Sequence, residues 1–227
     1  MKNLNMHPTK TIFIPCYCQK DPLPALSEAL KIINKNNFKK ISVALTVQHL
    51  NRKEQVRKFL EDSGVKVTSE QQVIGCRMDN IDSEADACLF IGSGRFHPLR
   101  IARLFEKTVI CANPLSGRAD TITSEEIEFC NKRDMRRILK AAKGTVFGII
   151  VSTKPGQQNL KFAFKLKEGI ESKGKKAFII AGDEINPHNL MGFKVDAFIN
   201  TACVRLVDDD FEKPVLNPGE IEIIFKF

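Results

Sequence analysis

Apolar residues occur in two kinds of run, and the two kinds alternate along the chain. Short continuous apolar runs are typical of buried strands, whereas apolar residues three or four positions apart are typical of helices. In the first half, residues 11–15 and 41–45 are predicted strands, and residues 23–34 and 52–63 are predicted helices. This alternation indicates βαβ units with a parallel sheet.

The second half follows the same plan, with predicted strands at 146–151 and 177–181 and a predicted helix at 160–172. The later parts of the halves also share sequence, with Asp-Ala at 86–87 and 196–197 and Asn-Pro at 113–114 and 217–218. Such matches at the same relative places favour an internal duplication. The predicted fold is therefore α/β, with two similar parallel-sheet (Rossmann-like) βαβ units related by an internal repeat. The predicted limits are 1–119 for the first unit, 120–143 for a basic helical linker and 144–227 for the second unit.

The linker pattern places four cations on one helix face: Arg133, Arg136, Arg137 and Lys140. A charged helix face is usually solvated surface, and we expect that here. Docking of an acidic partner is the alternative.

Composition is that of an ordinary globular protein, with 43% hydrophobic and 27% charged residues among 227. No apolar run approaches the roughly 20 residues that span a bilayer, and residues 1–10 lack a signal-peptide stretch, so a cytoplasmic protein is expected. The formal net charge of +8 suggests an anionic partner. One tyrosine, no tryptophan and no interleaving of aromatic and basic residues disfavour nucleic acid.

The chain has seven cysteines, and a disulfide framework is not expected in a cytoplasmic protein of this length. Cys88 lies inside a predicted strand, Cys130 inside the linker helix and Cys111 at a strand end before Asn-Pro, so these three are interpreted as packed hydrophobes. The other four lie at strand ends or turns, where ligands of parallel sheets bind: Cys16, Cys18, Cys76 and Cys203. Their dispersed spacing does not by itself define a metal site.

Two further segments follow predicted strands. Residues 92–98 contain a Gly-x-Gly turn that opens a helix, which suits an anionic group but also fits an ordinary strand-to-helix turn. Residues 152–158 offer a lysine for a carboxylate or phosphate, with hydroxyl and amide groups beside it, but lack the Walker spacing. The candidate binding residues of the two segments are Gly92, Ser93, Gly94, His97, Ser152, Thr153, Lys154 and Gln157.

At these motifs the sequence resembles the diphthamide-synthesis family, the archaeal 2-(3-amino-3-carboxypropyl)histidine synthases. The resembling segments, in order, are Thr-Val-Gln-His at 46–49, Val-Ile-Gly-Cys at 73–76, Phe-Ile-Gly-Ser-Gly at 90–94, Phe-His-Pro-Leu at 96–99, Val-Ser-Thr-Lys at 151–154, Gly-Gln at 156–157, Asn-Thr-Ala-Cys at 200–203 with Arg205, Asp-Asp at 208–209 and Lys-Pro-Val-Leu at 213–216. Several motifs in one order are far more specific than any single one.

The resemblance implies a noncanonical radical S-adenosylmethionine enzyme. Such enzymes use a [4Fe-4S] cluster to produce a 3-amino-3-carboxypropyl radical, which is transferred to a histidine of elongation factor 2. Cys76 and Cys203 match two of the three cluster ligands, and the segments 92–98 and 152–157 would surround S-adenosylmethionine, with Lys154 and Gln157 near its amino-acid end. An electron donor is implied, and pairing with a second copy or with a longer homologue is expected.

The resemblance covers the second and third family domains only, without the first domain and its cluster cysteine. Val204 also replaces the proline expected after the Thr-Ala-Cys motif. Since a cluster with one open iron needs three thiolates, we hypothesise that Cys16 or Cys18 supplies the third. Cys18 is favoured because it lies farther into the loop. The alternative to an enzyme is a non-catalytic partner subunit of a longer homologue.

Overall fold

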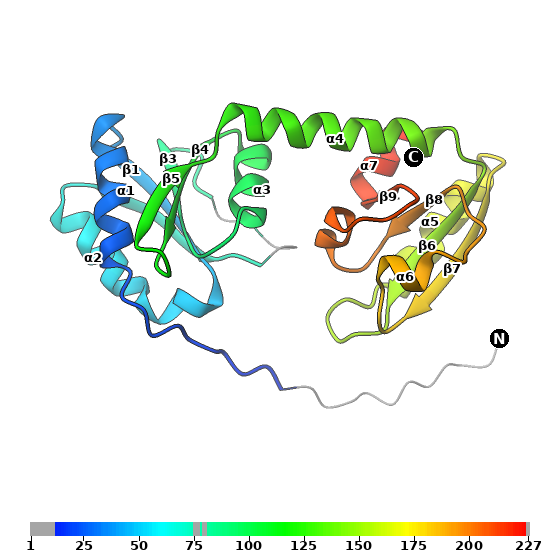
Figure 1. Ribbon diagram of the computed structural model, residues 1–227, viewed down its shortest axis with the longest axis horizontal. Coiled ribbons are helices and arrows are strands. Elements are labelled where there is room, and N and C mark those ends of the chain that lie inside the picture. Colours follow the sequence, from blue (N-terminus) through cyan, green and yellow to red (C-terminus); the bar gives the residue numbers. More distant parts are fainter. Residues whose placement is uncertain (1–11, 75–77, 79–80, 226–227) are drawn as a thin grey trace.

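The computed structural model describes residues 12–74, 78 and 81–225. Two units, each built around its own sheet, are joined by one long helix, α4, at Ser124–Ala142 (Figure 1). We call the elements before α4 the first unit and those after it the second unit.

The sheet of the first unit has the strand order β2-β1-β3-β4-β5. The first four strands of this order run parallel, and β5 runs antiparallel to β4. Their bounds are β1 Lys40–Leu45, β2 Lys66–Gln72, β3 Ala87–Ile91, β4 Thr108–Asn113 and β5 Arg118–Thr121. The three inner strands carry nearly continuous runs of buried residues, because helices cover both faces of the sheet.

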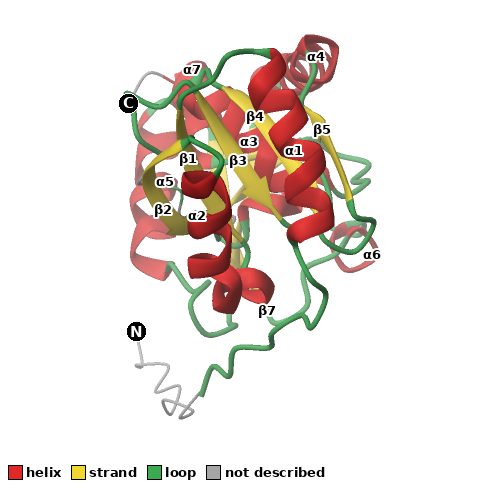
Figure 2. Cartoon of the chain, turned by 90° about the vertical axis from the view of Figure 1, so that its left-hand side faces the viewer, coloured by secondary structure: helices red, strands yellow, loops and turns green. Residues whose placement is uncertain are grey.

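Helices α1 and α2 cover one face of this sheet and α3 covers the other (Figure 2). The helical bounds are α1 Leu23–Lys35, the 3-10 helix η1 Val47–Arg52, α2 Lys53–Asp62 and α3 Phe96–Phe105. Leu26 and Leu60 belong to the core on the first face, and Phe90 and Ile101 belong to the core on the second. The sheet is therefore the middle layer of three.

The sheet of the second unit has the order β7-β6-β8-β9, all parallel. Its elements are β6 Val146–Ser152, α5 Leu160–Ser172, β7 Lys176–Gly182, α6 Pro187–Leu190, β8 Ala197–Asn200, the 3-10 helix η2 Val204–Asp208, β9 Val215–Leu216 and α7 Pro218–Phe225. Phe147 packs in the core under α5 and α7, and Phe198 packs with Leu206 on the opposite face. Most predicted strands and helices are confirmed, some with ends shifted by a few residues.

The four parallel strands of each sheet follow the same order, and an aspartate accepts backbone hydrogen bonds at the start of β1 and another at the start of β6. The carboxylate of Asp86 accepts the backbone N–H groups of Lys39 and Lys40, at 2.6 and 2.8 Å. That of Asp196 accepts those of Thr145 and Val146, at 2.7 and 2.9 Å. The matching Asp-Ala sequences thus mark the same hydrogen-bonding role in both units.

The hydrogen bond from the backbone N–H of Thr145, and next that from Val146, hold the pKa of Asp196 below its ordinary value. The stabilisation is present above the ordinary Asp pKa of about 4 and is lost as pH falls through the lower folded-state pKa. Asp196→Asn should therefore reduce the free energy of unfolding at pH 7 and leave it nearly unchanged in strong acid. Urea unfolding at both pH values measures this, and an equal loss at both would contradict it.

The prediction of a buried strand at 11–15 is wrong for the residues that the structure describes. Ile12, Phe13 and Ile14 form no strand and are more than 70% exposed, and residue 11 lies outside the described part. Strand β1 already has β2 on one side and β3 on the other, so it offers no free edge to such a segment. The apolar run is typical of a buried strand, but it does not show which neighbouring strand would pair with it.

Helix α4 begins with a capping box between Thr123 and Glu126 and buries Cys130, Ile138 and Ala141. Arg133 pairs with Asp208 at 2.6 Å, and Arg137 pairs with Asp134 and Glu220. The prediction of a solvated charged face is therefore wrong for these two arginines, because they fasten the helix to the second unit.

Arg136 and Lys140 of the same helix are exposed, as that prediction requires. Within the described part of the chain, no helix has the length and apolar character needed to cross a membrane.

Candidate functional site

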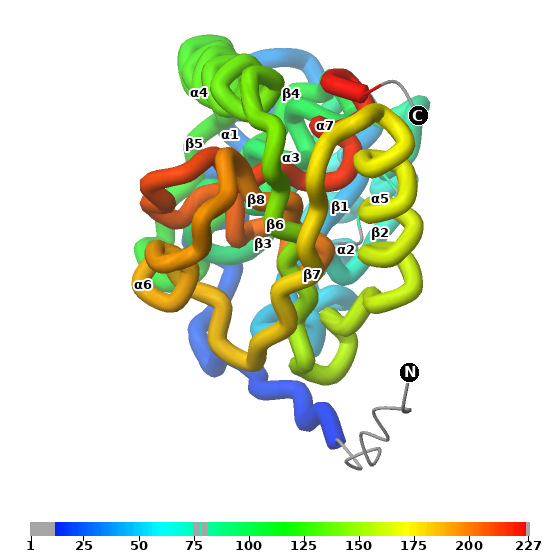
Figure 3. Tube along the Cα trace, turned by 90° about the vertical axis from the view of Figure 1, so that its right-hand side faces the viewer, coloured from blue at the N-terminus to red at the C-terminus, as the bar shows by residue number. Residues whose placement is uncertain are grey.

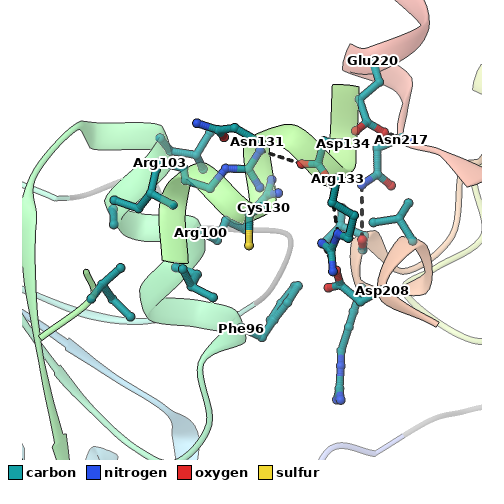
Figure 4. A pocket seen from close by; sticks show the side chains of 18 of the residues that line it. Phe96, Arg100, Arg103, Cys130, Asn131, Arg133, Asp134, Asp208, Asn217 and Glu220 are labelled. Carbon is teal, nitrogen blue, oxygen red and sulfur yellow. Dashed lines mark hydrogen bonds and ion pairs between the residues drawn. The ribbon is translucent and has the colours of Figure 1, made fainter. Parts of the chain in front are cut away.

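A cavity of about 1030 Å³ lies between the two units and beneath α4. Figure 4 shows Phe96, Arg100 and Arg103 on one side, with Asp208, Asn217 and Glu220 on the other. The walls come from α3, from η2 and from the start of α7, so neither unit forms this cavity alone.

The cavity walls are rich in arginine. Arg103 pairs with Asp134 at 2.6 Å, and Arg133 and Arg137 have the carboxylate partners described above. Arg100 and Arg205 also line the cavity, and neither has an ion-pair partner among the described residues. Two unpaired guanidinium groups favour an anionic ligand, since arginine binds carboxylate and phosphate through several N–H donors.

The turn at 92–95 joins β3 to α3, as predicted. Gly92 has no room for a side chain, because a Cβ there would lie 2.8 Å from the ring of Phe90 and 3.0 Å from the methyl group of Thr46. Gly94 has a φ of +80°, which is strained for other residues. The glycines therefore satisfy the geometry of the turn itself, which is the ordinary interpretation, and the backbone of the exposed Gly94 is also accessible.

His97, in the first turn of α3, is half-buried and stacks on Phe90 at a centroid distance of 6.0 Å. Burial lowers the pKa of His97, and the positive charge of Arg205 lowers it further. His97 belongs to the first unit and Arg205 to the second, so the structure brings together two motifs that are more than 100 positions apart. His97 is consequently neutral at pH 7.

Arg205→Ala should raise the pKa of His97, because the nearby positive charge that disfavours imidazolium is removed. Burial would still hold that pKa below 6.5. NMR titration of the imidazole measures the change. Arg100→Ala is the matched control, since Arg100 lines the same cavity and is not among the charges that shift His97. An unchanged His97 pKa in Arg205→Ala would contradict the electrostatic influence of Arg205 on His97.

The segment 152–158 follows β6 as a turn, with Ser152 buried and Lys154 and Gln157 exposed. The N–H of Lys154 donates to the hydroxyl of Ser152 at 3.1 Å, and the hydroxyl of Thr153 donates to Asp183 at 2.7 Å. The hydroxyls of Ser152 and Thr153 thus shape the turn, which leaves the ammonium of Lys154 in solvent.

The predicted binding residues do not themselves line the cavity. Its walls include Phe96 and Leu99, within two positions of His97, and Val204 and Arg205, within two positions of Cys203. Whether the turns at 92–95 and 152–158 share one ligand therefore stays a prediction.

Cys203 is exposed and lies just after β8, at the amino end of η2. The buried side chain of Asn200 fixes this turn by accepting the N–H of Ala202 at 2.9 Å and donating to the carbonyl of Cys203 at 2.8 Å. Asn200 also donates to Asn217, which begins the segment into α7. The thiol is thus presented at the carboxyl end of the second sheet by a hydrogen-bonded turn.

Cys18 is half-buried, and its N–H donates to the carbonyl of Gln48 at 2.7 Å, close to the carboxyl end of β1. Cys16 is exposed, and Cys76 lies outside the described residues. The described residues contain no cluster of three His, Cys, Asp or Glu side chains that could hold a metal ion. The full set of predicted cluster ligands is therefore untested.

The remaining cysteines are packed hydrophobes, as predicted: Cys88, Cys111 and Cys130 are buried. Burial raises the pKa of the Cys88 thiol far above its ordinary value and that of Cys111 to about 12. The thiols of Cys88 and Cys111 therefore stay protonated at neutral pH. The exposed Cys16 and Cys203 and the half-buried Cys18 have the accessibility that iron–sulfur ligation requires. Accessible cysteine sulfurs are the ligands that iron–sulfur clusters use, so Cys16, Cys18 and Cys203 fit such a cluster.

Three side chains that shape the site were not predicted from the sequence: Arg100, Asn200 and Arg205. Arg205 stood in a resembling motif without an assigned role, and its position two residues after Cys203 was the available signal. Asn200 also stood in that resembling motif without an assigned role, whereas Arg100 carried no signal, because an arginine on a helix is common.

Parallel α/β units, an accessible thiol at a strand end and an arginine-lined cavity between the units define a two-unit α/β protein with a candidate ligand site. The chain belongs to the family described as "Putative diphthamide synthesis protein", whose model matches residues 2–226. The resemblance found in the sequence is therefore confirmed.

Two archaeal relatives are named 2-(3-amino-3-carboxypropyl)histidine synthase. The protein of Pyrococcus horikoshii is 34% identical over 226 residues, covering 94% of this chain and 65% of the relative. That of Methanocaldococcus jannaschii is 33% identical over 230 residues, covering 96% and 62%. The crystal structure of Dph2 from Pyrococcus horikoshii with a 4Fe-4S cluster is similar, with a TM-score of 0.84 and 34% identity over 94% of this chain and 65% of that one. The chain thus spans less than two thirds of these relatives.

Proposed function

We propose that this protein is a cytoplasmic, S-adenosylmethionine-dependent transferase of the diphthamide-synthesis type. It would transfer a 3-amino-3-carboxypropyl group to a histidine of elongation factor 2 or to another acceptor. The observation that carries the proposal is the cavity that Arg205, two residues after Cys203, lines together with Phe96, the neighbour of His97 at the start of α3 in the other unit. Family membership and the names of the archaeal relatives support it.

In this proposal Cys76 and Cys203 bind a [4Fe-4S] cluster, together with Cys16 or Cys18. When bound, the cluster supplies the electron that cleaves the bond between the γ-carbon and the sulfonium sulfur of S-adenosylmethionine. The 4Fe-4S cluster in the similar Dph2 structure from Pyrococcus horikoshii supports this cofactor. Asn200 would hold the backbone of Cys203 in one conformation, so that the sulfur of Cys203 is already positioned for the cluster.

The protein's own groups suit S-adenosylmethionine. A neutral His97 does not repel the sulfonium cation, whereas an imidazolium would. Arg205 has no described ion-pair partner and offers the methionine carboxylate a charged donor, and Lys154 and Gln157 would stand near the same amino-acid end. The exposed backbone at Gly94 permits close approach of the ligand.

The deciding experiment is anaerobic incubation of the reconstituted protein with dithionite and S-adenosylmethionine. We expect 5′-methylthioadenosine, which requires cleavage at the γ-carbon, and none without reductant. Formation of 5′-deoxyadenosine instead would indicate a different radical chemistry and overturn the proposal.

The third ligand can be assigned by iron content. Cys18 has a fixed backbone near β1, and Cys16 is fully accessible, so both remain candidates. Cys16→Ala and Cys18→Ala are prepared separately, and the one that loses iron identifies the ligand. Unchanged iron in both variants would remove this assignment.

A second candidate is a partner subunit without catalysis of its own. One observation favours it: the Caenorhabditis elegans relative is named as subunit 1 of the synthase, with 32% identity over 207 residues. In that case the protein alone would give no methylthioadenosine, and adding a longer homologue would restore its formation.

We also infer that the two units, proposed at 1–119 and 144–227 with a link at 120–143, descend from one duplicated unit. The shared strand order and the paired roles of Asp86 and Asp196 support this inference.

A further inference from the structure

The solvent-facing side of α4 carries exposed apolar side chains. Phe129, Met135 and Leu139 are 68%, 50% and 58% exposed, whereas the opposite side of the helix is buried against the two units. Figure 1 shows α4 along the outside of the molecule, and Figure 3 shows the same placement from the side of the second unit. Single exposed apolar residues are ordinary, but a group of them on one helix indicates an interaction site.

A row of cations lies beside these apolar side chains. Residues three or four positions apart follow one another along one side of a helix. Four exposed cations of α4 and its C-cap have this spacing: Lys132, Arg136, Lys140 and Lys143. Lys132 pairs with Glu128 at 2.6 Å, and Lys140 donates to the carbonyl of Glu212 at 3.2 Å. Arg136 and Lys143 form no ion pair among the described residues, so the row keeps free positive charge.

No carboxylate balances this side of the helix between residues 129 and 143. The single acidic residue of that stretch is Asp134. Its side chain is only 13% exposed and pairs with Arg103 and Arg137, so its charge is already used inside the molecule. The solvent-facing side of this stretch is therefore apolar and cationic.

The acidic loop of the second unit, residues 208–212, lies on another flank of α4. Arg133 pairs with Asp208 of this loop at 2.6 Å. At 3.6 residues per turn, Arg133 stands about 160° round the helix from Met135. The flank with Met135 and Leu139 is therefore open to a partner.

The helix is a rigid platform for such a partner. Arg103 of α3 pairs with Asp134 at 2.6 Å, and Arg137 pairs with Glu220 of α7, so ion pairs hold α4 to both units. The capping box orders its first turn. A surface that is already ordered binds without the cost of ordering it.

We propose that this side of α4 docks an acidic amphipathic helix of another protein. Acidic side chains of that partner would lie over the cation row, and its apolar side chains would pack on Met135 and Leu139. Docked helices present apolar side chains three or four positions apart. Complementary charge selects the partner and speeds its approach, while burial of the apolar side chains adds affinity.

The arrangement of the two kinds of side chain favours a protein over a membrane or a nucleic acid. A helix that lies on a membrane has a broad apolar face with its cations on the polar side. Here Lys132, Arg136 and Lys143 lie in the middle of the exposed side, between Phe129 and Met135. Single-stranded nucleic acid binds to several aromatic side chains by stacking, and this side of α4 has one.

Fluorescence anisotropy of a labelled helical peptide tests the charged row, with the full chain and without cofactor. The probe is a designed peptide with leucine at every third or fourth position and glutamate beside it. We expect saturable binding, and Arg136→Glu with Lys143→Glu should weaken it about tenfold. Lys161→Glu with Lys165→Glu is the matched control, because it makes the same charge change on the exposed surface of α5, and it should leave the affinity unchanged.

The apolar contribution is tested at constant charge. Met135→Ser with Leu139→Ser should also weaken peptide binding about tenfold, because the contacts with the leucines are lost. Both residues are exposed, so thermal unfolding should stay near that of the wild type. Leu160→Ser of α5, where the leucine is 40% exposed, is the control and should bind as the wild type does.

Three results would overturn the proposal. The first is no binding of the acidic peptide, and the second is equal affinity in the wild type and in both α4 variants. The third is tighter binding of polyuridylate or of phosphatidylserine vesicles than of the peptide, weakened by the same variants, which would assign this side of α4 to that ligand. A peptide with lysine in place of glutamate should bind Arg136→Glu with Lys143→Glu better than it binds the wild type.

Discussion

Cys203→Ala should lose most of the cluster iron and reduce methylthioadenosine formation by about a hundredfold or more, since losing a ligand exceeds the roughly 10- to 100-fold cost of losing an outer contact. Cys203 is exposed and contributes nothing to the apolar core, so the variant should unfold at the wild-type temperature. Iron content per chain and product formation after anaerobic reconstitution measure the effect.

The matched control is Cys88→Ala. Cys88 is completely buried inside β3, and burial keeps its thiol protonated, so its removal should leave iron content unchanged. Full iron loading of Cys203→Ala would contradict the assignment of this thiol as a cluster ligand, whatever the activity of the variant.

Arg137→Ala should lower the free energy of unfolding by about 3 kcal/mol, because it leaves Glu220 without its ion-pair partner in a mostly buried setting and removes one of the partners of Asp134. The guanidinium of Arg137 bridges Asp134 of α4 and Glu220 of α7, and its side chain is only 11% exposed. Urea unfolding at neutral pH measures the change. The effect should exceed that of an ordinary surface ion pair, since water screens this one poorly.

The neighbouring Arg136 provides the control for this prediction. It lies on the same helix, is exposed and forms no ion pair among the described residues, so Arg136→Ala should change the free energy of unfolding by less than about 0.5 kcal/mol. Equal losses in the two variants would show that helix propensity, and not the buried ion pairs, stabilises α4.

Parts of the candidate site were visible in the sequence for a physical reason. Glycine at 92 and 94 marked a turn because only glycine fits the space beside Phe90 and the positive φ at 94. The accessible Cys203 stood out because it follows an apolar run directly. Arg100 gave no such signal, because its role depends on which wall of the cavity it faces.

The apolar segment at 12–14 shows the opposite limit. Its residues have a high propensity for strands, but the segment forms none in the structure. A strand exists only where a neighbouring strand offers hydrogen bonds. The same reasoning applies in reverse to β2, whose polar residues gave no apolar pattern although β1 offers it a complete partner.

Local patterns in the chain were enough to establish the parallel α/β class, the helices and inner strands, and the separation of buried from accessible cysteines. They were enough because burying apolar side chains on both faces of a sheet leaves a periodicity that short windows of sequence preserve. Packing between distant elements was needed to show that Arg205 lowers the pKa of His97, that Arg133 and Arg137 fasten α4, and that one side of α4 is left open. Those facts depend on where one element lies against another, and no short-range pattern encodes the distance between residues so far apart in the chain.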